Sequence, residues 1–363
     1  MIIEIDSGAF LAAVKRAAQI IESRNVPILQ TVLLEADGES LAVSATNMTQ
    51  YMTLAVPCVL ESGESAAAAV DASLLIAAVK PGKALRIEFG NEYINLVSGR
   101  RNVSLKTLPA EDFPKFVQEA GESYDFTLTP EQLAGILLVR RGISTEETRY
   151  YLNGICLHQT ANGLRAIATD GHRLFLSDVA ASADIGPDRY IIPREAVAAI
   201  AAADWGGDLA GRINKRVVSF EGNGIKLASK LIDGSFPEYE RIMVSAEGSR
   251  AEFTDFAEFS ATIQKTAIFK EAIRGVKITP EDGGYAVESV YRGNLVQDFH
   301  ECRPGSVKFG VNARYVDDIA AVITGDCTMY QRDGASPILF LPCIHQAGDD
   351  LPSVQVILMP MRV

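Results

Sequence analysis

The sequence predicts an α+β protein built from six similar units, each an amphipathic helix followed by short antiparallel strands. Three observations predict this class: six segments carry helix-start signals and an apolar face, their starts recur at a long period, and β-branched runs with Gly-containing turns fill the intervals. With 363 residues, 48% hydrophobic and 22% charged, the chain is long enough for several globular domains. Pairing the units predicts three domains, residues 1–119, 120–244 and 245–363, each with two helices packed on antiparallel sheet.

The six predicted helices begin at residues that are typical of helix N-termini. The first is expected over about 7–22, with Phe10 and Val14 on its apolar face. The third has the clearest start, because Thr129 is a good cap and Pro130 suits the first helical position. The other four are expected to begin near residues 72, 194, 255 and 312, so successive starts are about 57 to 65 residues apart.

Each interval between helices contains a turn with glycine after its first β-branched run. The turns are Asp37-Gly38, Gly90-Asn91, Asn162-Gly163, Gly222-Asn223-Gly224, Asp282-Gly283-Gly284 and Asp333-Gly334. Gly beside Asn or Asp indicates a hairpin, because such pairs supply the positive φ that tight turns require. Regularly spaced turns also occur in α+β proteins without repeats, but six agreements in the same order favour a repeat.

Charge is distributed unevenly along the chain. The net charge of −12 argues against a protein that wraps tightly onto nucleic acid. Several basic residues nevertheless fall in the predicted helices, while the acidic excess falls in loops and strand edges; the basic residues are Lys15, Arg16, Lys80, Arg140, Arg141, Lys265, Lys270 and Arg274. If the helices share one side of an assembly, these residues form a lining that contacts phosphates without reading bases. The helix macrodipole, which favours Lys and Arg at helix C-termini, explains the same placement equally well.

The sequence lacks the motifs of common enzymes, metal sites and membrane proteins. It has no P-loop, nucleophile elbow or His-Glu-x-x-His, and its five cysteines are scattered without a Cys-x-x-Cys pair. Cys156 and His158 share one face of a predicted strand, but two ligands do not make a zinc site. No apolar run is long enough for a membrane span, and the first residues do not resemble a signal peptide. We expect a cytoplasmic protein with no catalytic residues, no metal and no cofactor.

One run has the look of a catalytic site: Thr169-Asp170-Gly171-His172-Arg173. Its Asp and His are two residues apart and could act as the acid–base pair of a hydrolase. The run also follows a predicted strand, and Asp-Gly is a turn former. Without a nucleophile or a metal cluster, a structural or binding turn is the favoured interpretation.

The same run carries a resemblance to a known family. The stretch Ala168–Leu174 resembles the signature of bacterial beta sliding clamps, the processivity subunit (beta) of DNA polymerase III. Five further stretches agree in order and spacing, so the resemblance covers essentially the whole chain; they are Pro27–Leu29, Leu105–Pro114, Arg149–Gly154, Ser229–Tyr239 and Met359–Val363.

The resemblance implies three tandem DNA-clamp domains in each protomer and a head-to-tail homodimer that closes a ring around duplex DNA, without sequence preference. It also implies a pocket where the polymerase alpha subunit, the clamp loader, other polymerases and repair proteins dock a short Gln/Leu/Phe-type peptide. Carried over residue by residue, that pocket contains Leu152, Thr169, Gly171, His172, Arg173, Leu174, Asn312, Tyr315, Met359, Pro360, Met361 and Arg362. For the last of these, a final edge strand with a frayed tail is the alternative, although two Met beside a Pro favour an adaptable binding surface.

The resemblance also assigns residues to DNA contact and to the dimer seam. The DNA contacts are Arg24, Tyr150 and Tyr151, for which a solvated loop charge and core aromatic rings are the alternatives. The seam would place Arg100, Val103 and Leu105 of one protomer against Ile268, Phe269 and Ile273 of the other; ordinary strand and helix packing is the alternative.

Some positions depart from the family pattern. Met243-Val244 stands where many relatives have Leu-Pro, which alters one pocket wall, and Gln297–Glu301 replaces a run of Glu expected near the seam. A divergent second copy of the clamp, or a peptide-binding scaffold that does not act on DNA, therefore stays open beside the processivity clamp and the hydrolase. A clamp would work in the bacterial cytoplasm, at the nucleoid.

Overall fold

The structure is a computed structural model, and it describes residues 1–22, 26–82, 84–116, 121–161, 163–180, 183–269, 274–343 and 353–362. The chain divides into two compact units, one of residues 1–129 with 198–231 and the other of residues 130–197 with 232–363. We call these unit 1 and unit 2. The predicted domain boundaries near residues 119 and 244 fall inside unit 1 and unit 2 respectively, so the three-domain division stays a prediction.

Within the described residues, six α-helices lie where the sequence predicts them. They are α1 (Ser7–Ala17), α2 (Ala72–Ala78), α3 (Pro130–Leu138), α4 (Arg194–Ala202), α5 (Phe256–Thr266) and α6 (Ala313–Ala320). Short 3₁₀ helices accompany them: η1 (Ala18–Ile20), η2 (Pro27–Gln30), η3 (Ala110–Asp112), η4 (Val139–Gly142), η5 (Glu147–Leu152) and η6 (Tyr239–Ile242). The first predicted helix is shorter than expected, because its α-helical part ends at Ala17 and a 3₁₀ turn follows.

Side-chain caps explain why four of these helices start where they do. The carboxylates of Asp6, Asp71 and Asp255 accept backbone N–H groups of the first turns of α1, α2 and α5, at 2.7, 3.0 and 2.9 Å. Asn312 caps α6 in the same way, accepting from Arg314 N at 3.0 Å. Each cap satisfies a donor that has no partner inside the helix.

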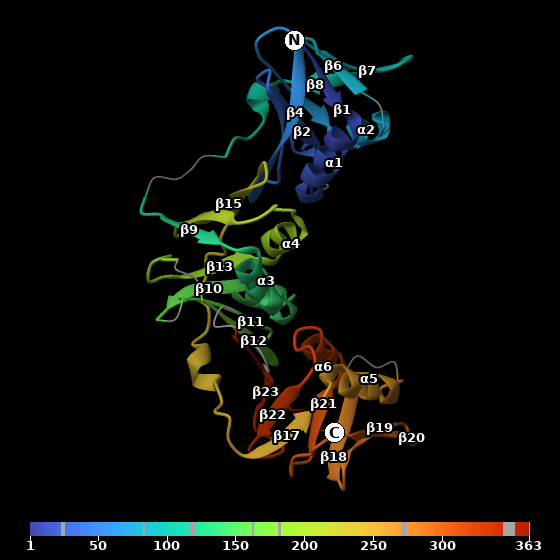
Figure 1. Cartoon of the computed structure of the whole chain (residues 1–363), viewed down its shortest axis with the longest axis vertical. Coiled ribbons are helices and arrows are strands. Elements are labelled where there is room, and N and C mark those ends of the chain that lie inside the picture. Colours follow the sequence, from blue (N-terminus) through green and yellow to red (C-terminus); the bar gives the residue numbers. More distant parts are fainter. Residues whose placement is uncertain are drawn as a thin grey trace. The chain divides into compact units, whose positions relative to one another are not determined.

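Unit 1 contains a twelve-stranded antiparallel sheet in the order β1-β6-β7-β8-β5-β2-β3-β4-β16-β15-β14-β9. Its strands are β1 (Ile2–Asp6), β2 (Thr31–Ala36), β3 (Ser40–Thr46), β4 (Gln50–Ser62), β5 (Ala66–Asp71), β6 (Ala84–Phe89), β7 (Tyr93–Ser98), β8 (Arg101–Leu108), β9 (Tyr124–Leu128), β14 (Leu209–Ile213), β15 (Val217–Gly222) and β16 (Ile225–Lys230). Figure 1 shows α1 and α2 together against this sheet. Phe10, Val14 and Leu75 on these helices are fully buried, which confirms the predicted apolar faces.

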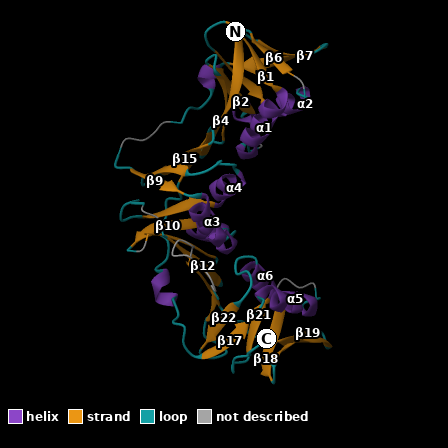
Figure 2. Cartoon of the chain, in the orientation of Figure 1, coloured by secondary structure: helices purple, strands orange, loops and turns teal. Residues whose placement is uncertain are grey.

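Unit 2 contains an eight-stranded sheet, β13-β10-β11-β12-β24-β23-β22-β17, and a four-stranded sheet, β20-β19-β18-β21. Their strands are β10 (Gly154–Thr160), β11 (Gly163–Thr169), β12 (Arg173–Val179), β13 (Arg189–Pro193), β17 (Ser249–Phe253), β18 (Gly275–Glu281), β19 (Gly284–Tyr291), β20 (Asn294–Glu301), β21 (Phe309–Asn312), β22 (Cys327–Gln331), β23 (Ile338–Pro342) and β24 (Ser353–Leu358). Helices α5 and α6 lie side by side, as Figure 2 shows in purple.

Two ladders join strands from different predicted domains. In unit 1, β4 pairs with β16, with Tyr51 opposite Ala228. In unit 2, β12 pairs with β24, with Leu174 opposite Ile357. Each ladder makes one continuous sheet from strands of two predicted domains, and the chain accordingly divides into two compact units rather than three.

The glycine turns are confirmed in position, except that Asn162 lies outside the described residues, and four of the six contain a glycine with positive φ: Gly38, Gly163, Gly224 and Gly283. Gly224 and Gly283 have φ of 71° and 83°, as the sequence predicts. Gly90 and Gly334 are not in this region. A Cβ at these two positions would lie 2.9 Å from Tyr93 O and 2.7 Å from Lys308 O, so close backbone approach requires glycine there.

Candidate functional site

The Thr169–Arg173 run forms a tight turn between β11 and β12. The Thr169 hydroxyl donates to Arg173 O at 2.6 Å and accepts from Gly171 N at 3.1 Å. The Asp170 carboxylate accepts the backbone N–H groups of His172 and Arg173 at 2.9 and 3.0 Å. The Asp170 side chain therefore stabilises the turn by accepting its backbone N–H groups. This geometry favours the structural or binding turn over an acid–base pair with His172.

Arg173 connects this turn to helix α6. Its guanidinium donates to the carboxylates of Asp170 and Asp318, and to Arg141 O at 2.9 Å. It also lies over the Tyr315 ring, 4.5 Å from the centroid. The side chains of Arg173 and Asp318 are only 10% and 17% exposed, so water screens their attraction weakly. The ion pair holds the turn against a helix 145 residues away in the chain.

The chain end lies against the same turn. Met359 N donates to His172 O at 2.8 Å, which extends the β12–β24 ladder by one hydrogen bond. Met361 N donates to Gly310 O at 2.9 Å, and Gly310 belongs to β21, the strand that leads into α6. The His172 ring stacks on Tyr315, with centroids 6.1 Å apart. The end of the chain is thus hydrogen-bonded at two points, whereas the Met359 side chain is 42% exposed.

A cluster of buried apolar side chains lies beside this turn, beneath the predicted pocket residues. Its buried members come from η5, β10 to β13, β23, β24 and the segment after β16, and are Leu152, Cys156, Ile167, Leu174, Leu176, Ile191, Phe236, Tyr239, Leu339 and Ile357. Met243 and Val244, the pair that departs from the family pattern, pack against it. They also line a pocket of about 190 Å³ with Tyr330 and Pro337. The two residues that depart from the family pattern, Met243 and Val244, therefore line this small pocket beside the apolar cluster.

The predicted pocket residues thus lie in one part of unit 2, in three different environments. Leu152, Thr169 and Leu174 are buried, Arg173 and Tyr315 form a sheltered polar wall, and His172 and Met359 are exposed. Asn312 caps α6, so its side-chain oxygen serves the helix. Pro360 and Met361 are half-buried, and Arg362 is exposed.

A second polar group ties the segment after β16 to the sheet. The His158 ring Nε2 and the Tyr239 hydroxyl are 2.8 Å apart, and Arg165 is paired with Asp178 at 2.5 and 2.6 Å. Burial lowers the pKa of His158 from its usual value, because the imidazolium would lose its water, and also raises the pKa of Tyr239. Burial raises the pKa of the Cys156 thiol to about 12. Cys156 and His158 are thus packing residues, and no group of three or more metal-ligating side chains occurs in the described part of the chain.

The lowered pKa of His158 predicts a loss of stability in mild acid. The unfolded chain takes up a proton near pH 6.5, before the folded chain does, so stability is full above that pH and falls as the pH drops below it. His300, whose pKa burial also lowers, adds to the effect. We expect the melting temperature to fall between pH 7 and pH 5, and to fall less in His158→Gln.

The matched control for that measurement is Tyr239→Phe. It removes the hydroxyl beside His158 but leaves the ring buried. Because burial is the main cause of the shift, this variant should keep most of the pH dependence. If the melting temperature fell equally steeply with decreasing pH in His158→Gln and in the unmodified protein, His158 would not be the cause of the acid sensitivity.

Comparisons with known proteins agree with the resemblance seen in the sequence. The family model of the DNA polymerase III beta subunit N-terminal domain matches residues 1–117, and that of the central domain matches residues 130–238. The beta sliding clamp of Caulobacter vibrioides (strain NA1000 / CB15N) is 32% identical, over 100% of both chains. The chain belongs to the beta sliding clamp family. The clamp of Pseudomonas aeruginosa is 26% identical over 99% of both chains. Among solved structures, the sliding clamp of Bartonella birtlesii bound to griselimycin has a TM-score of 0.90 and 29% identity, covering 100% of both chains.

The residues expected to contact DNA in this clamp are only partly described. Arg24 lies outside the described residues. Tyr150 and Tyr151, on η5, have ring centroids 5.8 Å apart. Tyr150 is 52% exposed, whereas Tyr151 packs against the apolar cluster. Of the two, Tyr150 presents the surface that a DNA contact needs.

The described residues expected at the dimer seam lie on strand β8, in the turn before it, and just after helix α5. Within the described part of the chain, β8 pairs with β7 along Arg101–Lys106 and with β5 only at Thr107 and Leu108. Leu105 is buried in its own core, Val103 is half-buried, and Arg100 is exposed. Ile268 is 59% exposed after α5 and Phe269 is half-buried; Ile273 lies outside the described residues.

Sequence reasoning missed two residues of the predicted pocket region. Asp318 pairs with Arg173 and Arg141, although Arg141 was expected to contribute to the basic lining. Arg149 lies so close to Gly171 that a Cβ there would be 2.6 Å from its Nη1. A signal for Asp318 exists in the sequence, because Tyr315 and Asp318 are three apart and share one helix face.

In the described residues, no helix is both long and apolar enough to cross a membrane.

Proposed function

We infer that this clamp is a non-catalytic processivity factor that encircles duplex DNA and tethers the DNA polymerase. The observation that carries this function is the match to beta sliding clamps over the whole chain, in sequence and in fold. Retention comes from enclosure, so the protein needs no tight contact with phosphates, and a net charge of −12 is compatible with DNA work.

Ring closure is supported by two unpaired strand edges. The outer edge of β8 in one protomer would meet β20 of the partner subunit, which pairs only with β19 in the described residues. Large apolar side chains are exposed on β19 and β20: Val290, Leu295 and Phe299, at 68%, 53% and 41%. An exposed strand edge with apolar side chains promotes aggregation. In a head-to-tail dimer, each of the two interfaces would pair and cover one such edge. The predicted seam residues Val103, Ile268 and Phe269, which are exposed or half-buried, would extend this contact.

For the partner-peptide pocket, we propose the floor around Leu174 with the wall of Arg173, Tyr315 and Met359. The apolar floor and few polar groups suit a short peptide with apolar side chains. A relative, the Bartonella clamp, is known with griselimycin bound. Polymerases, the clamp loader and repair proteins would compete for this one pocket.

We also propose that Arg24, Tyr150 and the exposed basic residues of the helices make sequence-independent contacts with DNA. These contacts would be weak, which allows sliding. The three predicted domains would then be pseudo-equivalent segments of the ring. A clamp of this kind works where the chromosome is, in the bacterial cytoplasm at the nucleoid.

Retention on DNA of different topology tests the function. After loading by a clamp loader, the protein should stay on nicked circular DNA and slide off the same DNA once it is linearised. The reason is that a closed ring can leave DNA without opening only by sliding off a free end. The measurement is co-elution with DNA in gel filtration at physiological salt. A peptide-binding scaffold would show no difference between the two DNA forms.

Ile268→Arg supplies the matched variant, because a side chain that is 59% exposed can be changed without disturbing the core. At the seam it should convert the dimer to a monomer by sedimentation and end retention on circles. Val59→Arg is the control, because Val59 is 67% exposed and lies on β4, away from the seam strand β8. Strand β4 pairs with β1, and β6 and β7 lie between β1 and β8 in the sheet. A monomeric unmodified protein at micromolar concentration would overturn the ring.

A further inference from the structure

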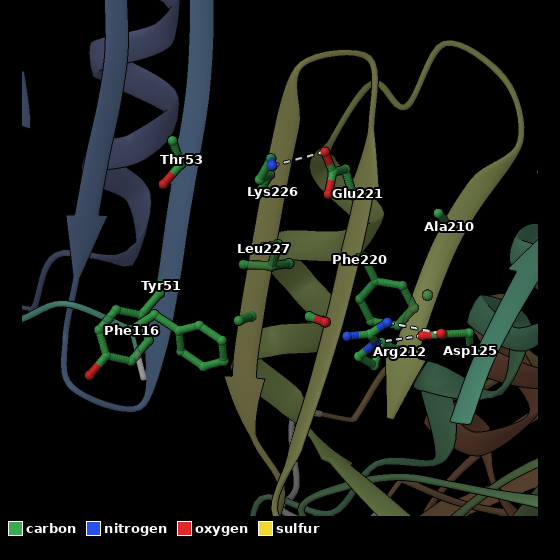
Figure 3. Close-up of a pocket in the computed structure, with 13 residues that line it drawn as sticks. Tyr51, Thr53, Phe116, Asp125, Ala210, Arg212, Phe220, Glu221, Lys226 and Leu227 are labelled. Atoms are coloured by element: carbon green, nitrogen blue, oxygen red, sulfur yellow. Dashed lines mark hydrogen bonds and ion pairs between the residues drawn. The ribbon is translucent and has the colours of Figure 1, made fainter. Parts of the chain in front are cut away.

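A hollow of about 480 Å³ lies on the sheet of unit 1, whereas the pocket described above belongs to unit 2. It spans strands β4, β16, β15 and β14, and Figure 3 shows its walls. Tyr51 and Phe116 stand on one side, with ring centroids 5.3 Å apart. Arg212 and Asp125 stand on the other side. The volume suits two or three side chains of a ligand.

The hollow arises from small residues in the middle of one row across the sheet. Cross-strand partners follow one another in the order Asp125, Arg212, Ser219, Ala228, Tyr51. Ser219 and Ala228 are short, whereas the ends of the row carry a guanidinium and an aromatic ring.

The neighbouring row closes one end of the hollow. It contains Ala210, Glu221, Lys226 and Thr53 as successive partners, and Lys226 pairs with Glu221 at 3.0 Å. The hollow therefore has a shallow floor between an aromatic wall and a charged wall, with an ion pair at its end.

The position of this hollow matches that of the peptide pocket in the other sheet. In the β12–β24 ladder the second rung from the turn is Leu174 opposite Ile357, which form the pocket floor. In the β4–β16 ladder the second rung is Tyr51 opposite Ala228, beside the hollow. A connecting segment packs beside each of these two ladders. In unit 2 it contributes Tyr239, Met243 and Val244, and in unit 1 it contributes Phe116, which packs on Tyr51.

The charged wall indicates which ligand group the hollow accepts. Arg212 binds both Asp125 oxygens through Nε and Nη2, at 2.5 and 2.9 Å. Its Nη1 has no hydrogen-bond partner among the described residues, and the side chain is 45% exposed. Since Arg212 already occupies the Asp125 oxygens, an incoming carboxylate is better placed than an incoming amine.

We propose that this hollow binds a short extended peptide of a partner protein, with an aromatic side chain against Tyr51 and Phe116 and a carboxylate at Arg212. The proposal rests on the proposed function, because it adds a second peptide site to a clamp that recruits partners. Tyr51 and Arg212 are three strands apart, roughly 14 Å, which an extended chain covers in about four residues. Residues i and i+4 of such a chain point to the same side.

The probe is the amidated peptide Phe-Thr-Val-Thr-Glu, labelled with fluorescein through a Gly-Gly spacer, and the readout is fluorescence polarisation with the full-length dimer. Ser219→Trp fills the hollow and Arg212→Glu reverses its charge, so each should weaken binding at least tenfold. The peptide Phe-Thr-Val-Thr-Lys should bind Arg212→Glu better than the unmodified protein.

Two controls keep the result specific to the hollow. Arg250→Glu changes another exposed Arg that is paired with an acidic side chain, 56% exposed on β17, and should leave binding unchanged. Deletion of residues 359–363 should also leave it unchanged. No binding by the unmodified dimer, or binding that the deletion removes and Ser219→Trp does not, would overturn the proposal.

Failure of the proposed function would look different. Ser219→Trp and Arg212→Glu should both keep retention on circular DNA, and Arg212→Glu tests the site even if the larger substitution unfolds the protein. If the unmodified protein is not retained on circles, the clamp function is wrong, whatever the peptide result.

Discussion

Removal of residues 359–363 will abolish stimulation of the polymerase while the protein stays dimeric. Met359 is the exposed thioether beside the His172 turn, and the backbone bonds of Met359 and Met361 hold the segment against β12 and β21. Few residues carry most of the affinity in a peptide interface, so loss of this wall should weaken binding by about 100-fold or more. The measurements are polarisation with a labelled Gln/Leu/Phe-type peptide, primer-extension length and sedimentation.

A single substitution separates the side chain from the backbone. Met359→Ala should reproduce part of the loss, whereas Met48→Ala removes an equally exposed thioether, 41% against 42%, from unit 1 and should have no effect. A truncated protein that still stimulated the polymerase would refute the pocket assignment.

Asp318→Ala should cause a large loss of stability, together with weaker peptide binding. It leaves the Arg173 guanidinium, only 10% exposed, with Asp170 and a carbonyl as its remaining partners, and it releases Arg141. Breaking a sheltered ion pair costs about 3–5 kcal/mol, and the remaining partners reduce this to about 2–3 kcal/mol. Peptide affinity should fall because Arg173 no longer holds Tyr315 and the turn in place. Urea unfolding and polarisation measure the two effects.

Asp317→Ala is the control on the same helix, because Asp317 is exposed. Its effect on stability should stay within about 0.5 kcal/mol. If both variants unfolded at the same urea concentration, the Asp318 pair would contribute little to the fold.

Local features were predictable because their causes lie within a few residues. The helix starts at Ser7, Ala72, Phe256 and Ala313 follow from a capping Asp or Asn immediately before them. The Thr169–Arg173 turn follows from the Asp-Gly pair. The family resemblance added the pocket and seam residues, which no spacing would assign.

Long-range pairings were not predictable in this way. Arg173 and Asp318 are 145 residues apart, and charge alone does not select one partner among many. The hollow at Ser219 and Ala228 depends on register across five strands, and a period-two pattern tells which face a residue occupies but not which residue lies opposite.

The sequence by itself determined the six helices, their long repeat, the hairpin positions and the family, because these depend on short-range chemistry and on motifs in order. Only the tertiary structure decided that β4 pairs with β16 and β12 with β24, that Asp318 anchors the His172 turn, and that small residues leave a hollow beside Tyr51. The physical reason is that a strand edge offers the same backbone groups to any other edge. The packing of the whole chain, rather than the strand's own residues, selects the partner.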